Sequence, residues 1–272
     1  MSGRVTASQR TFSSLGCAEL ELDEVIALAK RHHVSAVELR TLGGSIDLSA
    51  YFSEHFEAPL KLREFVNASG VRVVGLDASC HLMADDAEGG AELLALAPWA
   101  EALGGVSIRV FDGGEQLDDE SIALGVARWN WWQHQRAERD WQTQLMIETH
   151  DTLITGDAVQ RFLAAAPAGT AILWDAFHTW SKGGEDPVDT WTHIHDAVVH
   201  IHVKDGVAGG PEGRAFTHTL PGQGDFPMAA LAERVAVDAY RGPLSLEWGR
   251  KWHPYLPPLD DALREAQAAG WW

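Results

Sequence analysis

Residues 144–175 read QLMIETHDTLITGDAVQRFLAAAPAGTAILWD, in which two short apolar runs, each closed by a carboxylate, flank a helical pattern. The runs 144–148 and 171–175 have the length and composition of buried strands, and 157–166 places apolar residues at helical spacing between them. Two strands separated by a helix of this length predict a parallel strand–helix–strand unit.

The same unit recurs along the chain. Strands are predicted at 11–15, 36–39, 71–76, 106–111, 144–148, 171–175, 198–203 and 244–248. Helices are predicted at 23–33, 60–68, 91–103, 118–139, 157–166, 187–197, 227–237 and 259–269. Eight such units in 272 residues are typical of an α/β protein with a single (β/α)8 TIM barrel, here one domain over 1–272.

A doubly wound sheet is the alternative arrangement of alternating strands and helices. It would place a Gly-rich phosphate-binding turn after the first strand, but residues 15–18 read LGCA and do not match G-x-G-x-x-G. The Gly-rich segment from Gly206 to Gly213 follows the seventh strand, and we expect it to be a loop.

Composition excludes several classes of protein. With 39 acidic and 21 basic residues the formal charge is −18, which argues against a nucleic-acid partner. No apolar run approaches the roughly 18 residues of a membrane span, and residues 1–10 lack a signal-peptide apolar segment. Cys17 and Cys80 cannot form a disulfide framework, so we expect a cytoplasmic protein with buried, unreactive thiols.

Four polar residues lie at the ends of four consecutive predicted strands: Glu148, Asp175, His202 and Glu247. In a barrel, the carboxyl ends of the strands surround one mouth, so these side chains should converge. Three carboxylates brought together repel one another unless a cation neutralises them. Carboxylates with one imidazole suit Mn²⁺ or Mg²⁺, with Co²⁺, Fe²⁺ or Zn²⁺ as alternatives.

Five segments resemble the xylose isomerase-like TIM barrel superfamily, which includes sugar and sugar phosphate isomerases and epimerases. They are AVELR at 36–40, MIETH at 146–150, WDAFH at 174–178, HIHVKD at 200–205 and LEW at 246–248. The resemblance implies that Glu148, Asp175, His202 and Glu247 bind a divalent metal and that the two glutamates also move protons. It further implies that His178 contacts the substrate.

The chemistry implied is isomerisation or epimerisation of a small sugar or polyol-derived substrate. A metal stabilises the enediolate that forms when a proton is removed next to a carbonyl group, and Glu148 and Glu247 serve as acid and base. A lyase is the alternative, because the same intermediate can expel a leaving group, as in inosose- or dehydroshikimate-type dehydratases or in keto-sugar β-elimination. Endonuclease IV-like DNA repair is disfavoured by the charge of −18.

A hydride shift is the other route to isomerisation, used by the xylose isomerases of that superfamily. It normally needs a second metal site, for which Asp205 is the one carboxylate left after the seventh strand, so we expect proton transfer.

Further candidates for substrate binding lie close to the same strand ends: His81, His150, Lys204, Arg214 and Trp248. Each has a structural alternative. His150 could bond a backbone carbonyl, Lys204 could pair with Asp205 or Glu247, and Trp248, with its neighbour Trp252, could pack at the rim. We expect the helix that carries Trp129, Trp131 and Trp132 to pack through them or to form a subunit contact, so a homo-oligomer is possible.

Overall fold

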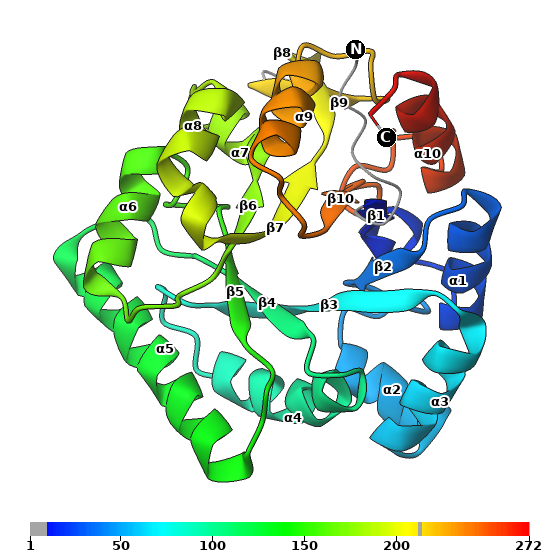
Figure 1. Ribbon diagram of the computed structural model, residues 1–272, viewed down its shortest axis with the longest axis vertical. Helices are drawn as coiled ribbons and strands as arrows, with labels where there is room; N and C mark the ends of the chain where they lie inside the picture. The colour runs from blue at the N-terminus through cyan, green and yellow to red at the C-terminus, as the bar shows by residue number, and fades with distance from the viewer. Residues whose placement is uncertain (1–9, 212–213, 272) are drawn as a thin grey trace.

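The computed structural model describes residues 10–211 and 214–271 and contains eight parallel strands in a nearly closed barrel, with helices outside it (Figure 1). The strands are β1 (Arg10–Phe12), β2 (Ala36–Leu39), β3 (Arg72–His81), β4 (Ser107–Phe111), β5 (Leu145–Glu148), β6 (Ile172–Asp175), β7 (Val198–Val203) and β10 (Leu244–Leu246). Their order is β1-β10-β7-β6-β5-β4-β3-β2, and a parallel bridge between Ser13 and Glu38 joins the two edges. The predicted TIM barrel is confirmed.

The outer layer consists of helices that follow the strands. They are α1 (Leu22–Arg31), α2 (Leu48–Phe56), α3 (Pro59–Ser69), α4 (Gly89–Ala102), α5 (Asp119–Arg139), α6 (Gly156–Ala165), α7 (Ala176–Ser181), α8 (Pro187–Ile194), α9 (Met228–Val237) and α10 (Leu259–Ala268), with 3-10 turns at Ser14–Cys17 and His195–Ala197. In α1, Val25, Ile26 and Ala29 recur at helical spacing and form its buried face. In α5, Asp118 and Ser121 form a capping box that fixes where the helix begins.

Four elements differ from the prediction. Helices α2, which has nine residues, and α7, which has six, were not expected. The expected loop at 206–213 is wrong in its described part, because β8 (Asp205–Ala208) pairs antiparallel with β9 (Phe216–Thr219) as a hairpin. Gly206 is required there, since a Cβ atom would lie 2.8 Å from the carbonyl oxygen of Thr217. The segment 206–213 is rich in glycine and lacks an apolar alternation, so the sequence did not indicate strand β8.

The interior of the barrel changes from apolar to charged toward the carboxyl ends of the strands. Ionisable side chains with less than about a tenth of their surface exposed gather there: Glu38, Asp77, Arg109, Glu148, Asp175, His200, His202, Lys204 and Glu247. Charged groups are rarely buried in this way unless they pair or bind an ion. The polar end of the barrel is therefore where a functional site is expected.

The two cysteines are buried free thiols, and burial raises the pKa of both to about 12. They lie in different parts of the barrel wall, Cys17 before α1 and Cys80 in β3. Within the described residues, no helix has the length and apolar character needed to cross a membrane.

Asp205 fixes the hairpin to the barrel. Its buried carboxylate accepts backbone hydrogen bonds from Gly206 at 2.8 Å, Gly222 at 2.8 Å, Gly224 at 3.0 Å and Phe226 at 3.2 Å. We expect Asp205→Ala to lower the free energy of unfolding by at least about 3 kcal/mol, because several N–H groups lose their acceptor.

Chemical denaturation monitored by circular dichroism measures this loss. The matched control is Asp225→Ala, which removes an exposed carboxylate from the same segment and should change stability by less than about 0.5 kcal/mol. Equal stability of the two variants would show that Asp205 does not hold the hairpin.

Candidate metal centre at the barrel mouth

The four predicted ligands converge at the carboxyl ends of the strands. Glu148 and Asp175 are the last residues of β5 and β6, His202 lies near the end of β7, and Glu247 directly follows β10. His202 Nδ1 lies 3.6 Å from Glu148 Oε1, 3.6 Å from Glu247 Oε1 and 4.0 Å from Asp175 Oδ2. One ligand atom from each residue lies within 4.8 Å of all the others.

These separations fit a shared cation better than direct contacts. A nitrogen and an oxygen 3.6–4.0 Å apart are too distant to form a good hydrogen bond. Two atoms that bind one ion at about 2.1 Å lie about 3 to 4 Å from each other. Among the described residues, neither Glu148 Oε1 nor His202 Nδ1 has a hydrogen-bond partner, although both are buried. Because orphaned polar atoms are costly in an interior, the residues present fit a bound divalent cation.

Glu38 orients the imidazole of His202. Both carboxylate oxygens of Glu38 lie 2.9 Å from His202 Nε2, and Ser245 Oγ donates a hydrogen bond of 2.7 Å to the same carboxylate. An Nε2–H that donates to Glu38 leaves the lone pair of Nδ1 free to face the other three ligands. A carboxylate behind a histidine is the usual support of a metal-binding imidazole. Sequence reasoning missed this role, although a carboxylate between Val37 and Leu39 in an apolar strand was a signal.

Arg109, which the sequence did not single out either, lies behind Glu148. Its Nε is 3.2 Å from Glu148 Oε2, and its Nη2 is 3.5 Å from Asp77 Oδ2. The guanidinium also lies 3.9 Å from the centroid of the Phe111 ring. Burial acts to raise the pKa of Glu148, but Arg109 together with His202 and His150 outweighs it and holds that pKa below its usual range. Glu148 is therefore ionised, as a ligand or a proton acceptor must be.

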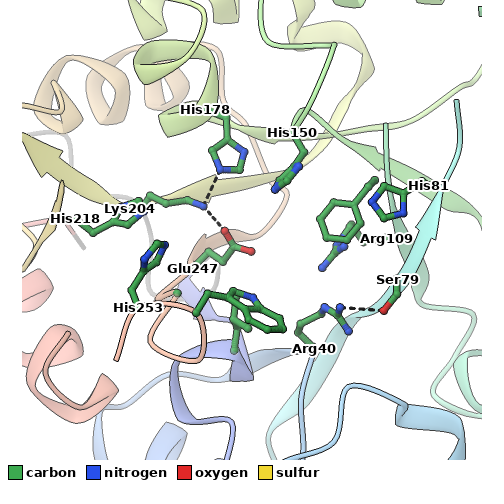
Figure 2. Close-up of a pocket in the computed structure, with 14 residues that line it drawn as sticks. Arg40, Ser79, His81, Arg109, His150, His178, Lys204, His218, Glu247 and His253 are labelled. Atoms are coloured by element: carbon green, nitrogen blue, oxygen red, sulfur yellow. Dashed lines mark hydrogen bonds and ion pairs between the residues drawn. The ribbon is translucent and has the colours of Figure 1, made fainter. Parts of the chain in front are cut away.

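Lys204 faces the opposite edge of the cluster. Its ammonium lies 2.7 Å from Asp175 Oδ2 and 3.3 Å from His178 Nε2, and it donates a short hydrogen bond to Glu247 (Figure 2). Burial acts to raise the pKa of Glu247, but Lys204 and His202 lower it to about 2. The expected pairing of Lys204 with Glu247 is thus present. Pairing with Asp205 is not, because that carboxylate accepts backbone N–H groups.

A cavity of about 340 Å³ opens above the cluster, within the size range of small-molecule sites. Glu247 reaches into it, and so do four of the predicted substrate-binding residues: His81, His150, His178 and Lys204 (Figure 2). His150 bonds Asp151 at 2.7 Å rather than a backbone carbonyl. The other lining residues are Leu15, Arg40, Ser79, Arg109, Phe111, His218, Gly249, Trp252 and His253.

The structure does not bring two of the predicted residues to this cavity. Trp248 is buried, and its indole N–H donates a hydrogen bond of 2.8 Å to the carbonyl of Pro257, so it packs behind the rim. Arg214 is exposed between β8 and β9 of the hairpin, and its guanidinium lies 5.2 Å from the centroid of the Tyr255 ring. Trp252 lines the cavity in place of Trp248. The predicted strand ran to residue 248, but β10 ends at Leu246. The alternation of side chains along a strand therefore does not apply to Trp248 and could not predict where its side chain lies.

Solved structures similar to this chain share its fold. The probable 3-DHS dehydratase AsbF, involved in petrobactin synthesis from Bacillus anthracis, is 16% identical with a TM-score of 0.76, over 96% of this chain and 97% of that one. A xylose isomerase domain protein from Planctomyces limnophilus is 16% identical with a TM-score of 0.72, over 96% and 94%. The 3-keto-D-glucoside 4-epimerase YcjR from E. coli is 13% identical with a TM-score of 0.69, over 96% and 98%.

A search of curated protein sequences found no match. The family model described as xylose isomerase-like TIM barrel matches residues 26–271, which contain all four predicted metal ligands. The chain belongs to the xylose isomerase-like TIM barrel family.

Proposed function

We propose that the protein is a divalent-metal-dependent isomerase or epimerase of a small sugar or sugar derivative that acts by proton transfer next to a carbonyl group. One observation supports this above all. Glu148, Asp175, His202 and Glu247 form a buried cluster with orphaned ligand atoms, and that cluster opens through Glu247 into a small cavity. Similar solved structures include an epimerase, which agrees with the proposal.

The four residues of the cluster would hold the cation, which we propose to be Mn²⁺ or Mg²⁺. When bound, it would supply a Lewis acid that stabilises the negative charge on the substrate oxygens after a proton is removed. Glu247 is ionised and lines the cavity, so we assign it the removal of that proton. Glu148 lies 3.6 Å from the same nitrogen of His202 as Glu247 does, and Arg109 helps to keep it ionised, so we assign it the partner role in returning a proton. The carbon and the face that receive the proton decide between isomerisation and epimerisation.

His178 and Lys204 are placed to bind substrate oxygens. His178 Nδ1 lies 3.0 Å from the carbonyl of Thr149, so the ring donates there and turns Nε2 toward Lys204 and the cavity. Burial, followed by Lys204, lowers the pKa of His178 well below its usual value, which keeps the ring neutral. A neutral Nε2 accepts a hydrogen bond from a substrate hydroxyl, while the ammonium of Lys204 donates one to an oxygen that gains negative charge.

A lyase is the second candidate, and the likeness to a probable 3-DHS dehydratase favours it. Removal of the same proton by Glu247 would lead to loss of a β-leaving group, with the ammonium of Lys204 nearby to provide its proton. The cluster and its ionised glutamates serve both outcomes, so the product distinguishes them.

A panel of keto-sugars and keto-polyols, with products analysed by mass spectrometry, tests the proposal. Protein stripped with a chelator should be inactive, and added Mn²⁺ should restore turnover to a product with the mass of its substrate. A product lighter by one water would establish the lyase instead. Equal turnover by stripped and reloaded protein would overturn metal dependence.

A further inference from the structure

Arg40 is a buried cation in the wall of the cavity. It directly follows β2, is 4% exposed, and lies with Ser79 on a different side of the cavity from Lys204 and His178 (Figure 2). Nη2 donates to Ser79 Oγ at 3.0 Å and Nη1 to the carbonyl of Ile46 at 3.3 Å. Two neutral acceptors thus use only part of its hydrogen-bonding capacity.

The other fully charged cations of the cavity have carboxylate partners. Arg109 pairs with Glu148 and Asp77, and Lys204 pairs with Asp175 and Glu247. Within the described ranges, no carboxylate lies within 4.0 Å of the Arg40 guanidinium. The charges of Asp77, Glu92 and Glu148 act on Arg40 from a distance, but none of them forms an ion pair with it. A buried guanidinium without a direct ion pair is costly, and a ligand carboxylate would supply one.

Burial, and after it the charge of Arg109, lowers the pKa of Arg40 to about 10, so the group stays protonated at neutral pH. Among the described residues that line the cavity, Glu247 is the single carboxylate, and it belongs to the metal cluster. The whole chain carries −18, so a basic lining is a local property of this cavity and not an average of the sequence.

We propose that Arg40 and Ser79 form a subsite for a carboxylate of the substrate, so that the enzyme acts on an acidic keto-sugar derivative in preference to a neutral one. This rests on the proposed function, in which the cluster binds the keto end of the same molecule. A planar guanidinium beside one hydroxyl group suits a carboxylate, which accepts two parallel hydrogen bonds. A phosphate is less suited, because TIM barrels usually hold phosphates in the loops after the seventh and eighth strands, whereas Arg40 follows the second.

Paired ligands that differ in one group test the subsite. The probes are 5-keto-D-gluconate, L-sorbose, which carries CH2OH in place of that carboxylate, and L-sorbose 6-phosphate. Titration calorimetry on Mn²⁺-loaded wild type should show the acid binding at least tenfold more tightly than L-sorbose. Arg40→Gln should weaken binding of the acid by about 10- to 150-fold, the range for a lost charged hydrogen bond, and leave L-sorbose unchanged.

Arg250→Gln is the matched control, because Arg250 lies near the mouth, pairs with Glu19 at 3.2 Å and does not line the cavity. It should keep the preference for the acid. Ser79→Ala keeps the Arg40 cation and should lose part of the preference for the acid. It tests the subsite independently if the Arg40 variant does not fold.

Three results would overturn the subsite. The first is that wild type binds 5-keto-D-gluconate no more tightly than L-sorbose, or binds neither of them. The second is a preference for the acid that survives Arg40→Gln, and the third is tighter binding of L-sorbose 6-phosphate than of 5-keto-D-gluconate. Manganese titration of the same samples separates this proposal from the function on which it rests. Arg40→Gln should bind Mn²⁺ like wild type. If wild type binds no Mn²⁺ but shows an acid preference that depends on Arg40, the subsite stands and the proposed function fails.

Discussion

Replacing Glu247 by Gln should reduce kcat by more than the roughly 10²- to 10⁴-fold usual for a lost general base. The amide has almost the same size, but it cannot accept a proton and is a poor ligand, so both proposed roles are lost together. Glu148→Gln should have an effect of the same order, because Arg109 then faces a neutral group in place of its carboxylate partner. Steady-state rates at saturating Mn²⁺ measure both effects.

Glu19→Gln is the matched control for these variants. Glu19 is an exposed carboxylate that pairs with Arg250, outside the cavity lining, and its replacement should leave kcat within about twofold of wild type. Turnover near the wild-type rate in either the Glu148 or the Glu247 variant would exclude that residue from the acid–base pair.

His202→Ala and Asp175→Asn should abolish stoichiometric metal binding. His202 is the one imidazole of the cluster, and Asp175 faces it across 4.0 Å. Asparagine at 175 keeps the oxygen that caps α7 through His178 N at 2.9 Å, so the local fold should persist. Glu38→Gln should weaken metal binding by about 10- to 100-fold, because it removes only the support of His202.

Metal content per chain after desalting, measured by mass spectrometry, gives the result. His193→Ala, which removes an exposed histidine from α8, should bind metal like wild type. Full occupancy in both His202→Ala and Asp175→Asn would show that these four residues are not the binding site.

The sequence predicted the four clustered residues because each interrupts an apolar strand at its end, and in a barrel all such ends meet at one mouth. The supporting residues could not be predicted in the same way. Glu38 and His202 are separated by 164 positions in the chain, and their contact depends on how β2 and β7 face each other inside the closed barrel. Arg109 lies within β4, where alternation alone does not show which neighbour receives its charge.

The residues beyond the strand ends were harder to place. His81, His150, His178 and Lys204 lie within or just after strands and reach the cavity as expected. Trp248 follows the end of β10, and Arg214 lies between the two strands of the hairpin, so their positions depend on loop geometry. The hairpin itself depends on Asp205, whose oxygens accept hydrogen bonds from residues up to 21 positions away. Asp205 is thereby committed to the fold and does not provide the second metal ligand that a hydride shift would require.

Reaction in heavy water tests most directly whether this barrel transfers a proton next to a carbonyl group. The Mn²⁺-loaded protein should place solvent deuterium on the carbon next to the carbonyl, detected by proton NMR and by mass, because Glu247 exchanges the proton it has removed. Glu247→Gln should lose this exchange together with turnover. A product free of solvent deuterium, from substrate that has demonstrably reacted, would contradict proton transfer and indicate a hydride shift.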